Sequence, residues 1–131
     1  ATRADSAKRT AFLQEAEANF RKAVATQAVL VERYPAVLSQ LVWLGRMQQQ
    51  LARTLSELGQ SVAARSQIEA SIRSLEQSLE QHPQYDVLNM SLAENHQVLA
   101  EIQQKLGENL AAKKARERAA QHRQQFKPPG R

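Results

Sequence analysis

The side chains in this sequence that are best suited to acid–base or metal chemistry are its three histidines, His82, His96 and His122. They lie far apart in the sequence, and Glu101, the carboxylate considered as a partner for His96, is five residues on and therefore on a different helix face. The chain has no Cys, so it has no thiolate ligand or nucleophile. No Ser, Asp or Glu stands in a nucleophile motif, and the glycines form no phosphate-binding loop. We therefore expect a protein that is not an enzyme, with no catalytic residue, no metal and no cofactor.

A run of cations near the end of the sequence could bind phosphate groups. Residues 1–110 hold eleven Lys and Arg against twelve Asp and Glu, whereas residues 111–131 hold seven against one. The candidate phosphate-binding side chains are Lys113, Lys114, Arg116, Arg118 and Arg123. Such a cluster could bind nucleic acid or an anionic surface through charge, although no aromatic residues are interleaved to stack on bases. Cations near a helix C-terminus are more often a solvated cap, so nucleic acid is the less favoured partner.

The composition indicates an all-α protein of one domain. The chain has 131 residues, 42% of them hydrophobic and only 5% aromatic, and it lacks the alternation of β-branched residues that strands require. No apolar run is long enough for a transmembrane segment. We expect a cytoplasmic location, although the sequence begins with Ala and could belong to a larger, membrane-anchored protein.

Helix-breaking residues recur at a fixed interval. Pro35 and Pro83 are 48 residues apart, and so are Gly59 and Gly107. The spacing predicts a repeat of two helices, the first from about Ala36 to Leu58 and the second from about Ser61 to Gln81. Leucines spaced three, four and seven apart give each helix an apolar stripe, so neighbouring helices should pack as antiparallel hairpins.

The second helix of each repeat carries a recognisable pattern of small and large residues. Ala16, Phe20 and Ala23 follow one another at four and three residues, and Ala64, Ile68 and Ser71 repeat the pattern 48 residues later. This pattern, with the Gly and Pro turns, resembles the tetratricopeptide repeat family. The unit of that family is about 34 residues long, so each helix here is about two turns longer, as in tetratricopeptide arrays that follow kinase-like domains in some bacteria. The resemblance implies a short α-solenoid that acts as a protein-interaction scaffold.

In that family, partners bind the concave surface formed by the first helices. Counted from the two glycines, the positions that would line this groove are Arg46, Gln49, Arg53, Ser56, Glu94, Gln97, Glu101 and Gln104. One wall is then cationic and the other anionic, which would suit a peptide of mixed charge, with the glutamine amides available to the peptide backbone. An equally good interpretation is that these residues are the solvated faces of two helices.

The resemblance and the turns divide the chain into units. We expect one domain over residues 1–126, with a partial unit at 1–35, whole units at 36–83 and 84–126, and a disordered tail at 127–131. The last helix should cap the stack with alanines, Leu110 and Phe126 on its inner side. Trp43 is expected to pack against the preceding helix. The apolar first helix lacks a partner, so residues 1–10 extend it, a helix is missing, or a second copy covers it as a homodimer.

Overall fold

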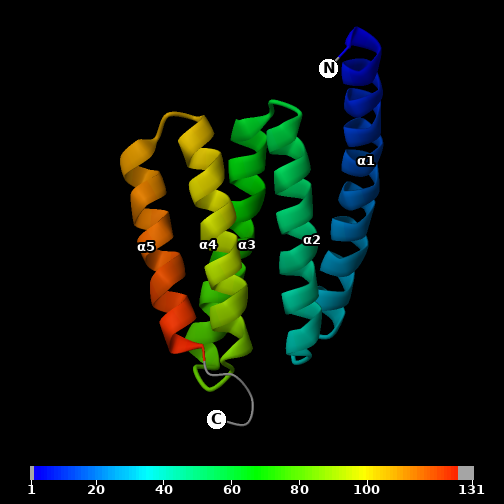
Figure 1. The fold of residues 1–131 in the computed structure, drawn as a ribbon. Coiled ribbons are helices and arrows are strands. Elements are labelled where there is room, and N and C mark those ends of the chain that lie inside the picture. Colours follow the sequence, from blue (N-terminus) through cyan, green and yellow to red (C-terminus); the bar gives the residue numbers. More distant parts are fainter. Residues whose placement is uncertain (1, 127–131) are drawn as a thin grey trace.

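The computed structural model describes residues 2–126 and is all helical over that range. Its five helices are α1 (Arg3–Arg33), α2 (Leu38–Glu57), α3 (Ser61–Gln81), α4 (Val87–Lys105) and α5 (Asn109–Gln125). They run alternately up and down, and each packs against the next in sequence order (Figure 1). The all-α architecture of antiparallel hairpins expected from the sequence is confirmed. The expected tail at 127–131 lies outside the described residues.

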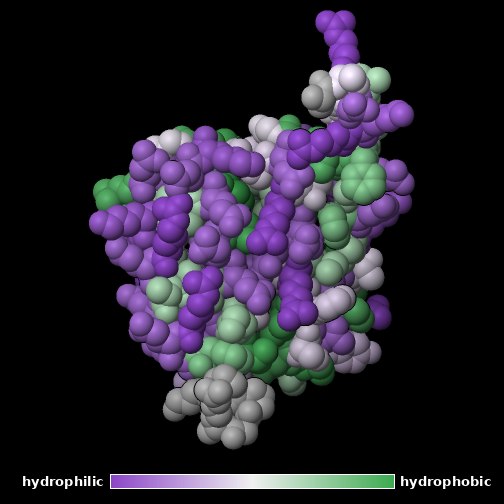
Figure 2. All heavy atoms as spheres, viewed as in Figure 1, coloured by the Kyte–Doolittle hydropathy of each residue, from purple (hydrophilic) through white to green (hydrophobic). Residues whose placement is uncertain are grey.

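The contacts between helices beyond the hairpins define how the hairpins stack. Helix α4 contacts α3 and α5, and it also contacts α2. In Figure 1, α2 and α4 lie side by side at the front, with α3 behind and between them. The two helices that open the repeats therefore form one face of the molecule, and α3 supports that face from behind. Most of the surface over α2 and α4 in this view is hydrophilic (Figure 2).

The repeated leucines form the core as the stripe pattern predicts. Leu51 is 1% exposed, and Leu55, Leu88 and Leu92 are fully buried. At the close-approach positions of the second helices, Ala64 and Ser71 are also buried. Small side chains at these points let the helix backbones cross near one another while the leucines fill the space between them.

Gly59 and Gly107 end α2 and α4 in the same way. Their φ angles are +80° and +77°, in the left-handed region that favours glycine. At the first turn, the Gly59 N–H donates to the Ser56 carbonyl (3.0 Å) and the Gln60 N–H to the Leu55 carbonyl (2.8 Å). The Gly107 turn has the same pair of bonds, so both are Schellman turns that satisfy the last carbonyls of a helix.

The first helix is longer than its repeat position requires. The sequence leaves three explanations for the apolar face of the first helix, and one of them is that residues 1–10 extend this helix. The structure shows this extension, because α1 begins at Arg3. Thr2 caps it: the Asp5 N–H donates to Thr2 Oγ1 (3.1 Å), and the Asp5 carboxylate accepts from the Thr2 N–H (3.4 Å). The N-terminal end of α1 stands beyond the turns of the other helices (Figure 1).

Two apolar side chains are more exposed than expected. Trp43, which should pack against the preceding helix, keeps 50% of its surface exposed and so can contact α1 with only part of its ring. Leu110 is 68% exposed, because it falls in the first turn of α5, off the line of Ala112, Ala115 and Ala119 that packs on α4. The cap helix is thus held mainly through alanines.

Candidate binding groove

A hollow of about 200 Å³ lies between the C-terminal halves of α2 and α4. Arg53, Ser56 and Glu57 line it from α2. The α4 side contributes Val98, Glu101, Ile102 and Lys105. The residues from each helix recur at three and four positions, which places them along the seam where the two helices meet.

Charges of both signs surround this hollow from both helices. Each helix contributes one cation and one anion, Arg53 and Glu57 from α2 and Lys105 and Glu101 from α4. Val98 and Ile102 are almost fully buried and form an apolar floor. The expectation of one cationic and one anionic wall is therefore wrong at this end of the groove, because Glu57 and Lys105 add the opposite charge to each wall.

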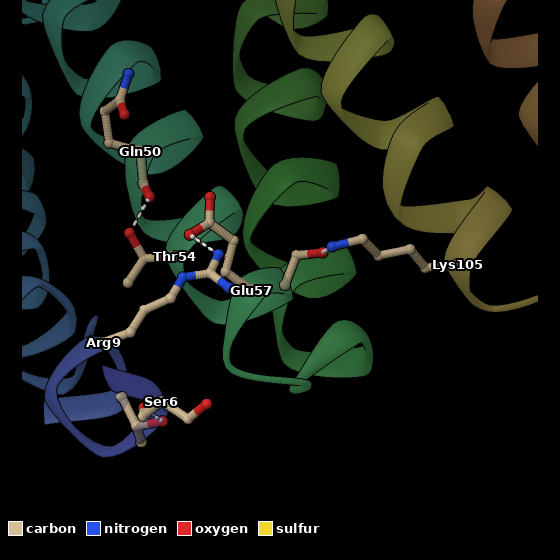
Figure 3. Close-up of polar contacts among 8 residues, drawn as sticks. Ser6, Arg9, Gln50, Thr54, Glu57 and Lys105 are labelled. Carbon is tan, nitrogen blue, oxygen red and sulfur yellow. Dashed lines mark hydrogen bonds and ion pairs between the residues drawn. The ribbon is translucent and has the colours of Figure 1, made fainter. Parts of the chain in front are cut away.

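Several polar contacts already hold the rim in place. Lys105 Nζ donates to Ser56 Oγ (2.9 Å), which joins the two helices across the seam. Glu57 pairs with Arg9 of α1 (3.5 Å), so α1 supports the outer edge of the groove (Figure 3). Thr54 Oγ1 donates to the Gln50 carbonyl within α2 (2.9 Å). The guanidinium of Arg53 and the carboxylate of Glu101 have no hydrogen bond or ion pair within residues 2–126 and face the hollow.

The eight groove residues expected from the sequence do not all lie in an open site. Arg53, Ser56 and Glu101 line the hollow, and Arg46 is exposed further along α2. Gln97 is partly buried on α4.

The other two glutamines are engaged within the chain. Gln49 is buried and donates to Glu94 across the seam (3.4 Å). Gln104 accepts a hydrogen bond from Arg116 of α5, so it lies on the α5 side of α4. One end of each amide is therefore already engaged within the chain.

Four residues that line the hollow are not among the groove residues predicted from the sequence: Glu57, Val98, Ile102 and Lys105. Lys105 follows Glu101 by four residues, and Val98 precedes it by three, so both continue the same row of α4. Glu57 follows Arg53 by four residues in the same way. For Lys105, Val98 and Glu57, the spacing of three or four residues from Glu101 or Arg53 is the sequence signal that predicts them, because it places them on the same face of each helix.

The basic residues of α5 are only partly available. Arg118 pairs with Glu76 of α3 (2.8 Å), and Arg116 is bonded to Gln104. Lys113, Lys114 and Arg123 are exposed. The positive face of α5 is therefore smaller than the sequence suggests.

Two of the three histidines, distant in sequence, lie together between α4 and α5. The rings of His96 and His122 are stacked, with centroids 5.6 Å apart and planes 12° from parallel. His96 is 6% exposed, and neither of its ring nitrogens has a hydrogen-bond partner among the described residues. His122 Nδ1 lies 2.9 Å from Asn89 Oδ1. Burial, then the nearby His122 and Arg118, lower the pKa of His96 from 6.5 to about 4.

Within residues 2–126, no group of three or more His, Asp or Glu side chains is arranged to hold a metal ion. Over the same range, none of the helices combines the length and apolar character required to cross a membrane. Comparisons with protein-family models, with curated proteins and with solved structures found no match.

Proposed function

We propose that this chain is a non-catalytic, tetratricopeptide-like scaffold that binds a protein or peptide segment along the seam between α2 and α4. The observation that carries the proposal is the hollow between these helices, with an apolar floor and charges of both signs around it. A segment that carries an apolar side chain between an acidic and a basic one would complement this arrangement.

The geometry favours the seam over other surfaces for a physical reason. Val98 and Ile102 give an apolar side chain a floor, and Arg53 and Glu101 are held on rigid helices with no partner of their own among the described residues. Such groups bind a ligand without first breaking internal contacts, so little of the interaction energy is lost to reorganisation.

The experiment compares two double variants of equal charge change. A peptide library displayed on phage is selected against the chain, and the affinities of the selected peptides are measured by fluorescence anisotropy. We expect Arg53→Ala with Glu101→Ala to weaken binding at least about tenfold, with helical circular dichroism unchanged. The control is Arg73→Ala with Glu80→Ala, two exposed residues of α3, which should leave affinity unchanged. If both double variants bound the peptides equally well, the groove between α2 and α4 would not be the binding site.

Nucleic acid or an anionic surface is the alternative ligand, through the exposed Lys113, Lys114 and Arg123 of α5. It is less well supported, because Arg116 and Arg118 are engaged within the chain. Binding of the chain to random DNA and RNA at low salt tests it directly. Retention that is lost on Lys113→Glu with Lys114→Glu, and that falls steeply with added salt, would favour the alternative.

A further inference from the structure

The first half of α1 exposes an apolar surface that no other helix of the described chain covers. Phe12 is 71% exposed. Beside it is a hollow of about 240 Å³ lined by Phe12, Glu15, Ala16, Asn19 and Phe20, all of them residues of α1. Phe12, Ala16 and Phe20 thus form a contiguous apolar surface, which is the kind of surface feature that marks interaction sites.

The charges that flank this surface alternate in sign. Lys8, Glu15 and Lys22 are seven residues apart, so they form one row along α1 beside Phe12. Lys8, Glu15 and Lys22 are all exposed and make no ion pair within residues 2–126. The row therefore offers unpaired cations and an unpaired anion to whatever covers the hollow.

A second copy of the same helix, running antiparallel, complements this row. When two identical helices pack antiparallel about a two-fold axis, the numbers of any two residues that face each other add up to the same value. If the axis passes beside Phe12, midway between Lys8 and Glu15, then Lys8 of each copy faces Glu15 of the other. The symmetry produces this ion pair twice.

The same register fills the hollow. A helical side chain leans toward the N-terminus of its own helix. In the antiparallel copy this direction points toward Ala16 and Asn19 of the first helix, so Phe12 of the second copy leans into the hollow. Ala16 is small enough to let the helices approach closely at this point.

We propose that two copies of this chain associate through the first half of α1, antiparallel, with Phe12 of each copy seated in the hollow of the other and with reciprocal Lys8–Glu15 pairs. The end of α1 that stands clear of the other helices makes this approach open (Figure 1). Because a single pair of helices makes a small interface, we expect a Kd of about 10 to 100 μM.

Sedimentation equilibrium of the chain at several concentrations tests the proposal. Phe12→Ser should raise the Kd of the dimer at least about tenfold by removing the buried ring. Because Phe12 is exposed in the single chain, the fold should survive, as helical circular dichroism would show. Val62→Ser, at an exposed valine of α3, is the matched control and should leave the Kd unchanged.

Charge exchange separates this register from any other. Lys8→Glu and Glu15→Lys should each weaken self-association by about threefold or more, since each places like charges opposite one another twice. An equimolar mixture of the two variants should restore the dimer, because both facing pairs are then of opposite sign. A wild-type chain that is monomeric at about 0.3 mM overturns the proposal. That result is expected if a helix of a different protein, rather than a second copy of this chain, covers the hollow. A dimer that does not respond to Phe12→Ser, or a mixture that does not restore it, also overturns the proposal.

Discussion

Three glycines in this chain illustrate how the same residue serves different purposes at different backbone angles. Gly59 and Gly107 have positive φ angles, with open space where a Cβ would lie. Gly45 lies within α2 at ordinary helical angles, where a Cβ would meet Ser71 Oγ at 3.4 Å and Leu75 Cδ1 at 3.5 Å. The first two are needed for their conformation, whereas Gly45 lies at a helix crossing that has room for one methyl group.

This difference leads to opposite effects of substitution to alanine. We expect Gly59→Ala and Gly107→Ala each to lower the free energy of unfolding by about 1 kcal/mol, because alanine is strained at positive φ. Gly45→Ala should leave stability unchanged or raise it by up to about 1 kcal/mol through its higher helix propensity. Urea unfolding followed by circular dichroism measures all three. A loss at Gly45 as large as that at Gly59 would contradict this account.

At the scale of the helices, the interface between α4 and α5 combines small apolar side chains with buried polar ones. Its apolar contribution comes mostly from Ala112, Ala115 and Ala119. Opposite them, α4 presents the buried polar side chains of Asn89, His96 and Gln103, spaced seven residues apart. Both ring nitrogens of His96 and Oε1 of Gln103 lack hydrogen-bond partners within the described residues. Buried polar groups without partners reduce the stability gained from packing α5.

The interface should also respond to pH. The pKa of His96 is lowered from 6.5 to about 4, and burial lowers that of His122 as well. When the folded pKa lies below the unfolded one, the fold is destabilised as the pH falls below 6.5, and the loss is complete below about 4. Arg118 of α5 adds to this effect, whereas Glu76 of α3 opposes it at His122.

We therefore expect the free energy of unfolding to fall between pH 7 and pH 4.5 by less in His96→Leu than in the wild type. His122→Gln, which can still bond to Asn89, should have a smaller effect. Taking the difference between each variant and the wild type cancels the titration of the carboxylates that they share. Urea unfolding across this pH range provides the measurement. If the free energy of unfolding fell equally with pH in His96→Leu and in the wild type, the buried imidazole would not be the cause of the pH dependence.

At the scale of the whole molecule, the sequence predicts the architecture better than the contacts across it. The 48-residue spacing of Pro and Gly, with the leucine stripes, is enough to predict the hairpins and their turns, because these depend on local conformation. The proximity of His96 to His122 and the exposure of Trp43 could not be predicted, since they depend on which flank of a helix each neighbour covers. The offsets taken from the family resemblance place Arg53 and Glu101 at the hollow, but not Gln49 and Gln104, for the same reason.

A stack in which most helices contact only their neighbours in sequence should not open uniformly. Helix α4 is packed against α2, α3 and α5, whereas α5 packs closely only against α4 among the described helices and is joined to α3 by the exposed Arg118–Glu76 pair. The first turns of α1 stand clear. In such a nearly one-dimensional arrangement, local stability depends on the interfaces at each position, so the ends open at lower cost than the centre.

Amide hydrogen exchange at pH 7 should therefore show the slowest exchange in α3, α4 and the C-terminal half of α2. Protection in α5 and in residues 3–10 of α1 should be lower by about a hundredfold or more. Self-association through α1 would protect residues 3–10 as the protein concentration rises, while α5 would not change. Uniform protection along all five helices would show instead that the chain unfolds as a single cooperative unit. Slow exchange in α2 and α4 together would mean that the floor of the groove is rigid before any ligand arrives, as binding to a preformed surface requires.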